Sequence, residues 1–309
     1  MRIVSLVEVV RGRLLNAAQV EAVGSVAFAG AKVKRGDCYF HLSGNEAELE
    51  LALRSGAFAV VFCGGCQIRD VEVAWIQVES FDRALAGVLR YRLIEQKAKV
   101  YQATPETVSI AASLITDTRL IATQTIETAI TRLGVAGAAD PILLCEEGGQ
   151  IAVATAAKEP IVPAEITVRK AGIFETTIAH KDREITIALS SLFANDLARA
   201  IGLSRSESLE LNLSRSISIA RFAAYPIRSG ASVLIFDSAD DREAEIAAQF
   251  IRKTAPWAKT IAPPQMPISE LIRIIKTNPF QYAYLRGFSK DETIAALARA
   301  ELVTNSLFG

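Results

Sequence analysis

The sequence predicts an α/β fold in three parts, covering residues 1–98, 99–228 and 229–309. Short runs rich in β-branched and aromatic residues alternate with segments whose apolar residues recur at helical spacing. In the last third of the chain, strand-like and helical segments follow one another regularly, which is typical of a parallel sheet. The composition, 50% hydrophobic and 22% charged, is that of a folded globular protein, and 309 residues are enough for two or three domains.

In the first part, residues 46–55 form a predicted helix that Gly56 ends. Residues 57–62 and 71–78 are short and β-rich, so each is a predicted strand. Ser80 follows as the N-cap of a helix that extends through Leu93. The order of elements is α/β.

The middle part begins with a predicted strand near Val100 and a helix that Thr104 caps. A long stretch rich in Thr, Ala and Ile follows, to which we assign no elements. Three strand-like segments, 165–168, 174–178 and 184–189, predict a small meander. Residues 193–201 predict a helix ending at Gly202, after which Ser204 and Glu207 form a capping box for another helix.

The third part opens with residues 231–237, an apolar run typical of a buried parallel strand. Ser238 and Asp241 can cap a helix through Phe250, and the connector 256–264 holds a short strand at 260–262. We then expect a helix at 269–276, a strand at 282–285 and a last helix with the capping box Ser289 and Glu292. This order predicts a small, Rossmann-like, doubly wound domain.

Composition also limits the function classes. The 34 basic and 34 acidic side chains balance, which argues against a broad nucleic-acid interface, because such interfaces need clustered Lys and Arg. No apolar run approaches the roughly 20 residues that span a bilayer, and the first residues contain no apolar signal-peptide core. We therefore expect a soluble, cytoplasmic protein. Four cysteines in a chain of this length do not form a disulfide framework.

The most informative segment is residues 32–44, which read KVKRGDCYFHLSG. It resembles the K-V-x-P-G-D signature of the Mur ligase family, with Arg35 in place of proline and a matching Gly44. Residues 52–61, ALRSGAFAVV, and the segment 78–92 are also similar to this family. The match is nearest to the ligases that add the third residue or the terminal dipeptide. It covers residues 1–98 well and the rest of the chain weakly.

This resemblance implies a Mur-ligase-like N-terminal domain, a middle domain that is a reduced remnant of the family's ATPase domain, and a small Rossmann-like C-terminal domain. The family consists of cytoplasmic bacterial enzymes that make peptidoglycan precursors by ATP-driven amide formation. Its D-S-R segment, which helps to hold the UDP end of the substrate, falls on Ala29, Gly30 and Ala31. Three small residues cannot replace the bidentate contact between arginine and phosphate.

The segment of this chain that aligns with the family's ATP loop also differs from the family motif. The family motif, T-G-[ST]-x-G-K-T-[ST], cradles the phosphates with backbone amides and a lysine. No lysine occurs in this chain between Lys99 and Lys158, and no glycine lies at the aligned positions. The sequence there predicts an ordinary helix start, with an N-cap, a proline at the first helical position and an acidic first turn. The aligned residues are Thr104, Pro105, Glu106, Thr107, Val108 and Ser109.

Weaker similarities continue downstream. Residues 146–151, EEGGQI, resemble the segment that in the family supplies a glutamate to magnesium, but a single carboxylate is a poor Mg²⁺ site, and we expect a turn before a strand. Arg221 matches the position of the family's G-R pair, and Asp237 and Ser238 match the start of its D-[SD]-Y-N segment. These three residues are the ligand-binding candidates that the resemblance implies. We expect no catalytic residues, no cofactor and no metal.

Cys63 and Cys66 form a C-x-x-C pair with two glycines between them. Such a pair is used in redox sites or as half of a zinc site. Zinc needs two more ligands, and a thioredoxin-like motif usually opens a helix and carries proline or an aromatic residue between its cysteines. A loop tip is the favoured interpretation, with redox or metal use as the alternative.

The leading hypothesis is a degenerate Mur-ligase-like protein, a pseudoenzyme, that binds a UDP-muramoyl peptide or an enzyme of the Mur pathway. One alternative is an active ATP- and Mg²⁺-dependent UDP-N-acetylmuramoyl-peptide ligase with a divergent nucleotide site. Another is a protein-interaction scaffold without a small-molecule site.

Overall fold

The computed structural model describes residues 1–135, 140–155, 159–181, 183–217, 222–228, 232–237, 241–257, 259–261, 266–277 and 280–306. The chain packs into two compact units. The first comprises Met1–Val162 with Gly202–Leu211, and the second comprises Pro163–Ile201 with Asn212–Gly309. The division into parts at residues 98 and 228 stays a prediction.

The first unit begins with a five-stranded sheet in the order β1-β5-β4-β3-β2. Four of its strands are parallel, and the edge strand β1 runs antiparallel to β5. The strands are β1 (Arg13–Leu14), β2 (Val26–Ala27), β3 (Cys38–Phe40), β4 (Ala59–Cys63) and β5 (Ala74–Val78). The predicted strands 57–62 and 71–78 are thus confirmed, with later starts.

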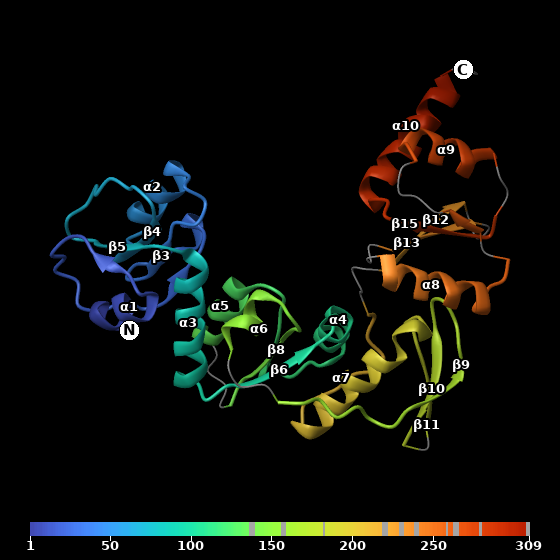
Figure 1. Ribbon diagram of the computed structural model, residues 1–309, viewed down its shortest axis with the longest axis horizontal. Coiled ribbons are helices and arrows are strands. Elements are labelled where there is room, and N and C mark those ends of the chain that lie inside the picture. The colour runs from blue at the N-terminus through green and yellow to red at the C-terminus, as the bar shows by residue number, and fades with distance from the viewer. Residues whose placement is uncertain are drawn as a thin grey trace. The chain divides into compact units, whose positions relative to one another are not determined.

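Helices cover both faces of this sheet, as Figure 1 shows for α1 (Ile3–Val10) and α2 (Glu46–Arg54). Alternating strand residues explain the two layers, because successive side chains of a strand point to opposite faces. Phe40, Val61 and Ile76 pack with α1 and α3 (Phe81–Glu95), whereas Tyr39, Val60 and Trp75 pack with α2. The short 3-10 helix η1 (Gly30–Lys32) packs against α2. The Ser80 hydroxyl caps α3 as predicted, accepting a hydrogen bond from the Arg83 N–H.

A second sheet in the same unit contains β6 (Lys99–Ala103), β7 (Leu120–Ala122) and β8 (Ile142–Glu146) in the order β6-β8-β7, all parallel. The helix α4 (Pro105–Leu114) packs on this sheet, and α5 (Ile126–Val135) and α6 (Gln150–Ala154) pack against α3. The Thr/Ala/Ile-rich stretch left without elements therefore holds β7, α5, β8 and α6. Local signals for two of these elements are present in the sequence: α5 buries Ile126, Ala129, Ile130 and Leu133 at helical spacing, and β8 is a short apolar run.

The second unit contains two sheets. The predicted meander is confirmed as β9 (Thr167–Lys170), β10 (Thr176–His180) and β11 (Arg183–Ile187), all antiparallel. The other sheet has the order β12-β13-β15-β14, where β13 (Ser232–Asp237), β15 (Tyr282–Arg286) and β14 (Lys259–Ile261) are parallel. The strand β12 (Phe222–Arg228), which the sequence analysis missed, runs antiparallel to β13.

Three helices cover the two faces of that second sheet (Figure 1). On one face α8 (Asp241–Thr254) packs through Ala247, Ala248 and Ile251. On the other lie α9 (Ile268–Thr277) and α10 (Lys290–Ser306). The Ser289 hydroxyl accepts a hydrogen bond from the Glu292 N–H at 3.4 Å, so the predicted cap of the last helix is present. The mixture of parallel and antiparallel sheets confirms the α/β class.

One predicted helix end is wrong. The helix α7 (Ala194–Ser206) continues through Gly202, because Gly202, Leu203 and Ser204 are buried and packing holds the glycine helical. The helix instead ends at Ser206, and Ser208, whose φ of 51° is left-handed, follows it in the C-terminal cap. The Leu209 N–H bonds to the Ser204 carbonyl at 2.8 Å and the Ser208 N–H to the Arg205 carbonyl at 3.3 Å, the two bonds of a Schellman motif. Ser204 and Glu207 therefore cap no further helix.

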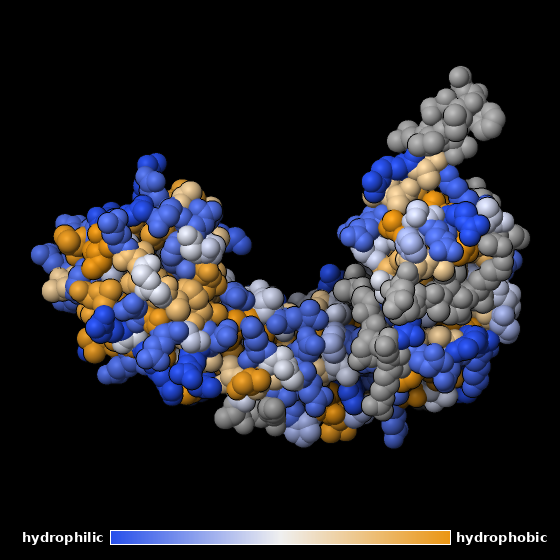
Figure 2. All heavy atoms as spheres, turned by 45° about the horizontal axis from the view of Figure 1, so that its top comes forward, coloured by the Kyte–Doolittle hydropathy of each residue, from blue (hydrophilic) through white to orange (hydrophobic). Residues whose placement is uncertain are grey.

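Among the described residues, no helix is long and apolar enough to cross a membrane. Hydrophilic and hydrophobic residues are interspersed on the face drawn in Figure 2.

Candidate functional site

The carboxyl edge of the β6-β8-β7 sheet is the candidate site. The chain leaves β6 through α4 towards β7, and it leaves β8 through α6 towards Glu159, which pairs with Tyr101 on the outer side of β6. The connections from the neighbouring strands β6 and β8 therefore run in opposite directions. In open α/β sheets, ligands bind outside the carboxyl ends of strands at such a switch point. The adjoining segments are 104–109 and 146–151.

The first segment is the start of α4. Thr104 is its N-cap: its Oγ1 accepts a hydrogen bond from the Thr107 N–H at 3.2 Å and lies 2.8 Å from the Thr107 hydroxyl. Pro105 occupies the beginning of the helix, and the Glu106 side chain, in the first turn, is buried with the residue only 7% exposed. The Ser109 hydroxyl donates to the Pro105 carbonyl at 2.9 Å. Val108 is buried in the core. The predicted helix start is thereby confirmed.

The second segment follows β8. Gly148, with φ of 78°, makes the turn that the sequence predicted. The Glu147 N–H donates to the Ala103 carbonyl at 2.8 Å and so ties the end of β6 to the residues after β8. A helix, α6, follows the turn where a strand was expected. Ile151, Ala152 and Ala154 are buried, and packing of this short segment against α3 and β8 selects the helix.

Residues 32–44, the signature segment, contain a turn in which the polar side chain of Asp37 is hydrogen-bonded to the backbone. The Asp37 carboxylate accepts hydrogen bonds from the Ser25 N–H at 3.1 Å and the Lys34 N–H at 2.8 Å, and Gly36 has a φ of 93°. Just before it, the Gly30 N–H donates to Glu48 of α2 at 2.6 Å. A Cβ on Gly30 would lie 2.3 Å from the Glu48 carbonyl oxygen, so this close approach requires glycine. The segment 29–31 is therefore packed against α2.

The remaining candidates lie elsewhere. Asp237, at the end of β13 in the second unit, is fully buried and accepts a hydrogen bond from the Tyr284 hydroxyl at 2.7 Å. Arg221 and Ser238 lie outside the described residues. Asp237 thus belongs to the second unit, whereas residues 104–109 belong to the first. The Asp237 carboxylate is hydrogen-bonded to a residue of its own sheet.

The cysteine pair lies at the end of β4. Cys63 is exposed, and its thiol lies 3.4 Å from the Glu79 carbonyl oxygen; Cys66 is half-buried, and both are free. Burial raises the pKa of the Cys66 thiol, which disfavours the reactive thiolate. Within the described part of the chain, no group of three or more His, Cys, Asp or Glu residues is placed to hold a metal ion.

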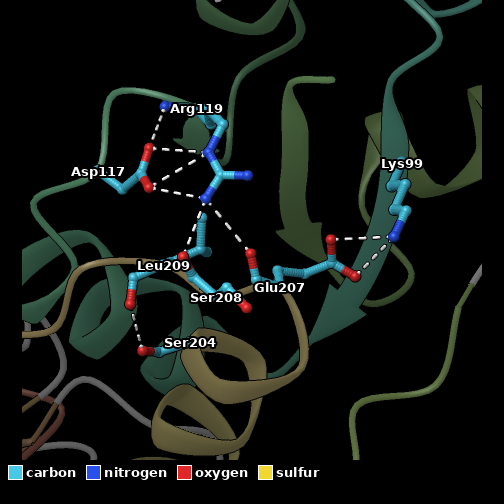
Figure 3. Close-up of polar contacts among 7 residues, drawn as sticks. All are labelled: Lys99, Asp117, Arg119, Ser204, Glu207, Ser208 and Leu209. Atoms are coloured by element: carbon cyan, nitrogen blue, oxygen red, sulfur yellow. Dashed lines mark hydrogen bonds and ion pairs between the residues drawn. The ribbon is translucent and has the colours of Figure 1, made fainter. Parts of the chain in front are cut away.

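Sequence reasoning missed a polar cluster around β6, of which Figure 3 shows the contacts of Lys99, Asp117, Arg119 and Glu207. Glu207, just after α7, forms an ion pair with Lys99 at 2.9 Å and accepts a hydrogen bond from the Tyr101 hydroxyl. The same hydroxyl lies 2.9 Å from Oε2 of Glu159. Arg119 pairs with Asp117 at 2.9 Å and donates to the carbonyls of Glu207 and Ser208. No local pattern signals this cluster, because its contacts join distant segments: Lys99 and Glu207 are 108 positions apart, and Tyr101 and Glu159 are 58 apart.

The charges of the cluster shift one another's pKa values. Burial, followed by hydrogen bonding to Glu207 and Glu159, raises the pKa of the Tyr101 phenol. Burial alone would raise the pKa of Glu207, but hydrogen bonds from Tyr101 and Lys99 outweigh it and the pKa of Glu207 lies below its usual range. Hydrogen bonds from Arg119 lower the pKa of Asp117. The cluster therefore holds the end of α7 against β6 with ionised carboxylates.

Comparison with known proteins identifies the fold. No protein-family model matches the sequence, and no curated protein sequence does. Among solved structures, the chain is similar to MurF from Acinetobacter baumannii, with a TM-score of 0.62 and 10% identity over 96% of this chain and 98% of that one. MurF ligase from Thermotoga maritima in complex with ADP gives a TM-score of 0.57 and 11% identity over 91% of this chain and 98% of that one.

A second Acinetobacter baumannii structure is that of UDP-N-acetylmuramoylalanyl-D-glutamyl-2,6-diaminopimelate–D-alanyl-D-alanyl ligase. Its TM-score is 0.59, with 10% identity over 96% of this chain and 98% of that one. At these identities the likeness is one of fold. The chain therefore has a Mur-ligase-like α/β fold, as the sequence predicted.

Proposed function

We propose that this protein is a degenerate Mur-ligase-like protein that does not form amide bonds with ATP and acts by binding a cell-wall precursor or a partner protein in peptidoglycan synthesis. The single observation that carries this proposal is the self-capped start of α4. By sequence this segment aligns with the family's ATP loop, and it lies at the carboxyl edge of the parallel β6-β8-β7 sheet.

The residues at that place do not fit a nucleotide phosphate. Helix N-termini bind phosphate through free backbone N–H groups. Here Thr104 uses the N–H of Thr107, Pro105 has no N–H, and Glu106 adds a carboxylate in the first turn. That negative charge stabilises the positive end of the helix dipole and repels a second anion. No lysine lies between Lys99 and Lys158 to contact a phosphate.

The residues at the same edge do not match the ligands that a magnesium ion needs. Mg²⁺ is usually held by one or two carboxylates together with substrate phosphates. Glu146 resembles the family's magnesium ligand by sequence, but a nucleotide to bridge with it is not expected. The changed segment 29–31, packed against α2 through Gly30, implies that any UDP-linked precursor is held differently from the way the family holds it.

The test is calorimetry on the full chain with a non-hydrolysable ATP analogue plus Mg²⁺, and separately with a UDP-muramoyl peptide. An authentic MurF ligase measured in the same buffer is the positive control. We expect no heat and no rise in melting temperature with the nucleotide, since a ligand that binds the folded state must raise stability. We also expect no ATP-dependent amide product.

The remaining outcomes distinguish the alternatives. Nucleotide binding or amide formation would overturn the proposal in favour of an active ligase with a divergent site. Retention of a Mur-pathway enzyme on the immobilised chain, without binding of the UDP-muramoyl peptide, would identify the partner as a protein and favour the scaffold. Binding of the peptide without nucleotide would identify the precursor as the ligand.

A further inference from the structure

The first unit contains a cavity of about 750 Å³ whose lining includes Gly148 and Gln150 of the segment 146–151 but no residue of the segment 104–109. Its walls come from α1 and α3 on one side and from the start of α5 and both ends of α6 on the other. The helices α1 and α3 meet closely at Gly87, where a Cβ would lie 2.0 Å from the Val9 carbonyl oxygen. The volume falls in the range of roughly 300–1,000 Å³ that is typical of small-molecule sites.

Arginine side chains from two helices line this cavity: Arg11 at the end of α1, and Arg83 and Arg90 on α3. The Arg90 Nε donates to the Ala154 carbonyl of α6 at 2.6 Å, which fixes this guanidinium at the wall. Among the described residues, neither Arg11 nor Arg90 is in an ion pair, and Arg83 pairs only with Glu79, which is outside the lining, at 3.9 Å. The carboxylates of Glu8 and Asp82 also line the cavity, but the three guanidiniums outnumber them.

The rest of the lining includes apolar side chains. Leu85 and Ile126 contribute from α3 and α5, and Val153 of α6 is 79% exposed, so its methyl groups remain in contact with water. Contact with an apolar ligand would remove that surface from water, which is favourable. Guanidinium groups match carboxylates and phosphates through their fork of N–H donors. The lining therefore matches a ligand with an anionic group on an apolar body.

We propose that this cavity is a binding site for a small molecule that carries a carboxylate or phosphate group on an apolar body. The anionic group contacts Arg11 and Arg90, and the apolar body lies against Leu85, Ile126 and Val153. The proposal goes beyond the proposed function and does not rest on it. None of these five residues lies in the segments that the family resemblance assigns to UDP or ATP.

The experiment uses three probes of similar shape with the full chain: 1-naphthyl phosphate, 1-naphthoate and the neutral 1-naphthalenemethanol. Binding is measured by calorimetry and located by amide shifts in a ¹⁵N-labelled sample. We expect at least one anionic probe to bind at millimolar concentration and to shift the amides of Gly87 and Gly148, with the neutral probe much weaker. The better of the two anions identifies the head group. The proposal is overturned if neither anion binds or if the neutral probe binds equally well.

Variants provide the specific test. Val153→Glu adds a negative charge to the wall at an exposed position, and we expect it to weaken anion binding by about tenfold, or about 1.4 kcal/mol. Val135→Glu is the matched control, because Val135 is also exposed, at 75%, and lies outside the lining. Arg90→Met should likewise weaken binding, whereas Arg54→Met on α2 should not. Unchanged affinity in both Val153→Glu and Arg90→Met would refute the site while leaving the ATP experiment unaffected.

Discussion

The hydroxyl of Tyr101 donates a hydrogen bond to the carboxylate of Glu207, a residue 106 positions later in the chain. Tyr101 is 3% exposed and Glu207 is half-buried, so this bond joins the middle of β6 to the residue just after α7 in a partly buried environment. The Lys99 ammonium neutralises the same carboxylate at 2.9 Å. A partly buried carboxylate is tolerated when it is paired and hydrogen-bonded in this way.

Tyr101→Phe should lower the free energy of unfolding of the first unit by about 1.5–3 kcal/mol, the usual contribution of a hydrogen bond to a charged group. Urea unfolding can be followed by the fluorescence of the buried Trp75 in a Trp257→Phe background, because the chain has only these two tryptophans. In a double-mutant cycle with Glu207→Gln, the two losses should not add. Full additivity would show that the bond contributes little.

The stability of the first unit should fall in acid through Glu207. The pKa of this carboxyl is lower in the folded state than its unfolded value of about 4.3, so its contribution is complete above that pH. The contribution is lost as the pH falls through the folded pKa and Glu207 takes up a proton. In Glu207→Gln, the free energy of unfolding should fall less steeply with decreasing pH below about pH 4.3 than in the parent protein. The remaining decrease comes from Asp117, whose pKa is also lowered in the folded state. Equal slopes in the two proteins would contradict the assignment.

Thr104→Ala should destabilise the first unit by about 1 kcal/mol, because it removes the N-cap of α4. Thr104→Ser keeps an oxygen at the cap and should stay close to the parent protein. Chemical unfolding of the three proteins provides the comparison. The prediction fails if the alanine and serine variants have the same unfolding midpoint, which would mean that Thr104 does not act as a cap.

Gly30→Ala should destabilise the contact between η1 and α2 by about 1–3 kcal/mol, because the added methyl group overpacks a tight site. Its Cβ would lie 2.3 Å from the Glu48 carbonyl oxygen. Gly65→Ala is the control, since nothing lies within 4 Å of a Cβ there and its φ is not left-handed. Thermal unfolding should separate the two variants, and equal melting temperatures would show that the close approach is not required.

Much of the local structure follows from the sequence. The caps at Ser80, Thr104 and Ser289 were predicted, because a capping side chain bonds to an N–H only two or three residues away. Strands such as β4 and β15 were predicted from short β-rich runs flanked by turn residues. The resemblance of residues 32–44 also predicted the Mur-ligase-like fold that the solved structures share.

Where local signals compete or are absent, the tertiary structure alone decided the conformation and the contacts. Gly202 and Ser204 have the residue types of a helix end and a new cap, but burial of Leu203 keeps α7 helical to Ser206. The cluster of Lys99, Tyr101 and Glu207 has no sequence signature, because its members come together only when Glu207, just after α7, reaches β6. In this protein, interactions within about four residues were determined by the sequence itself. Contacts between distant segments, which compete with local propensity through burial and charge pairing, were decided by the packed fold.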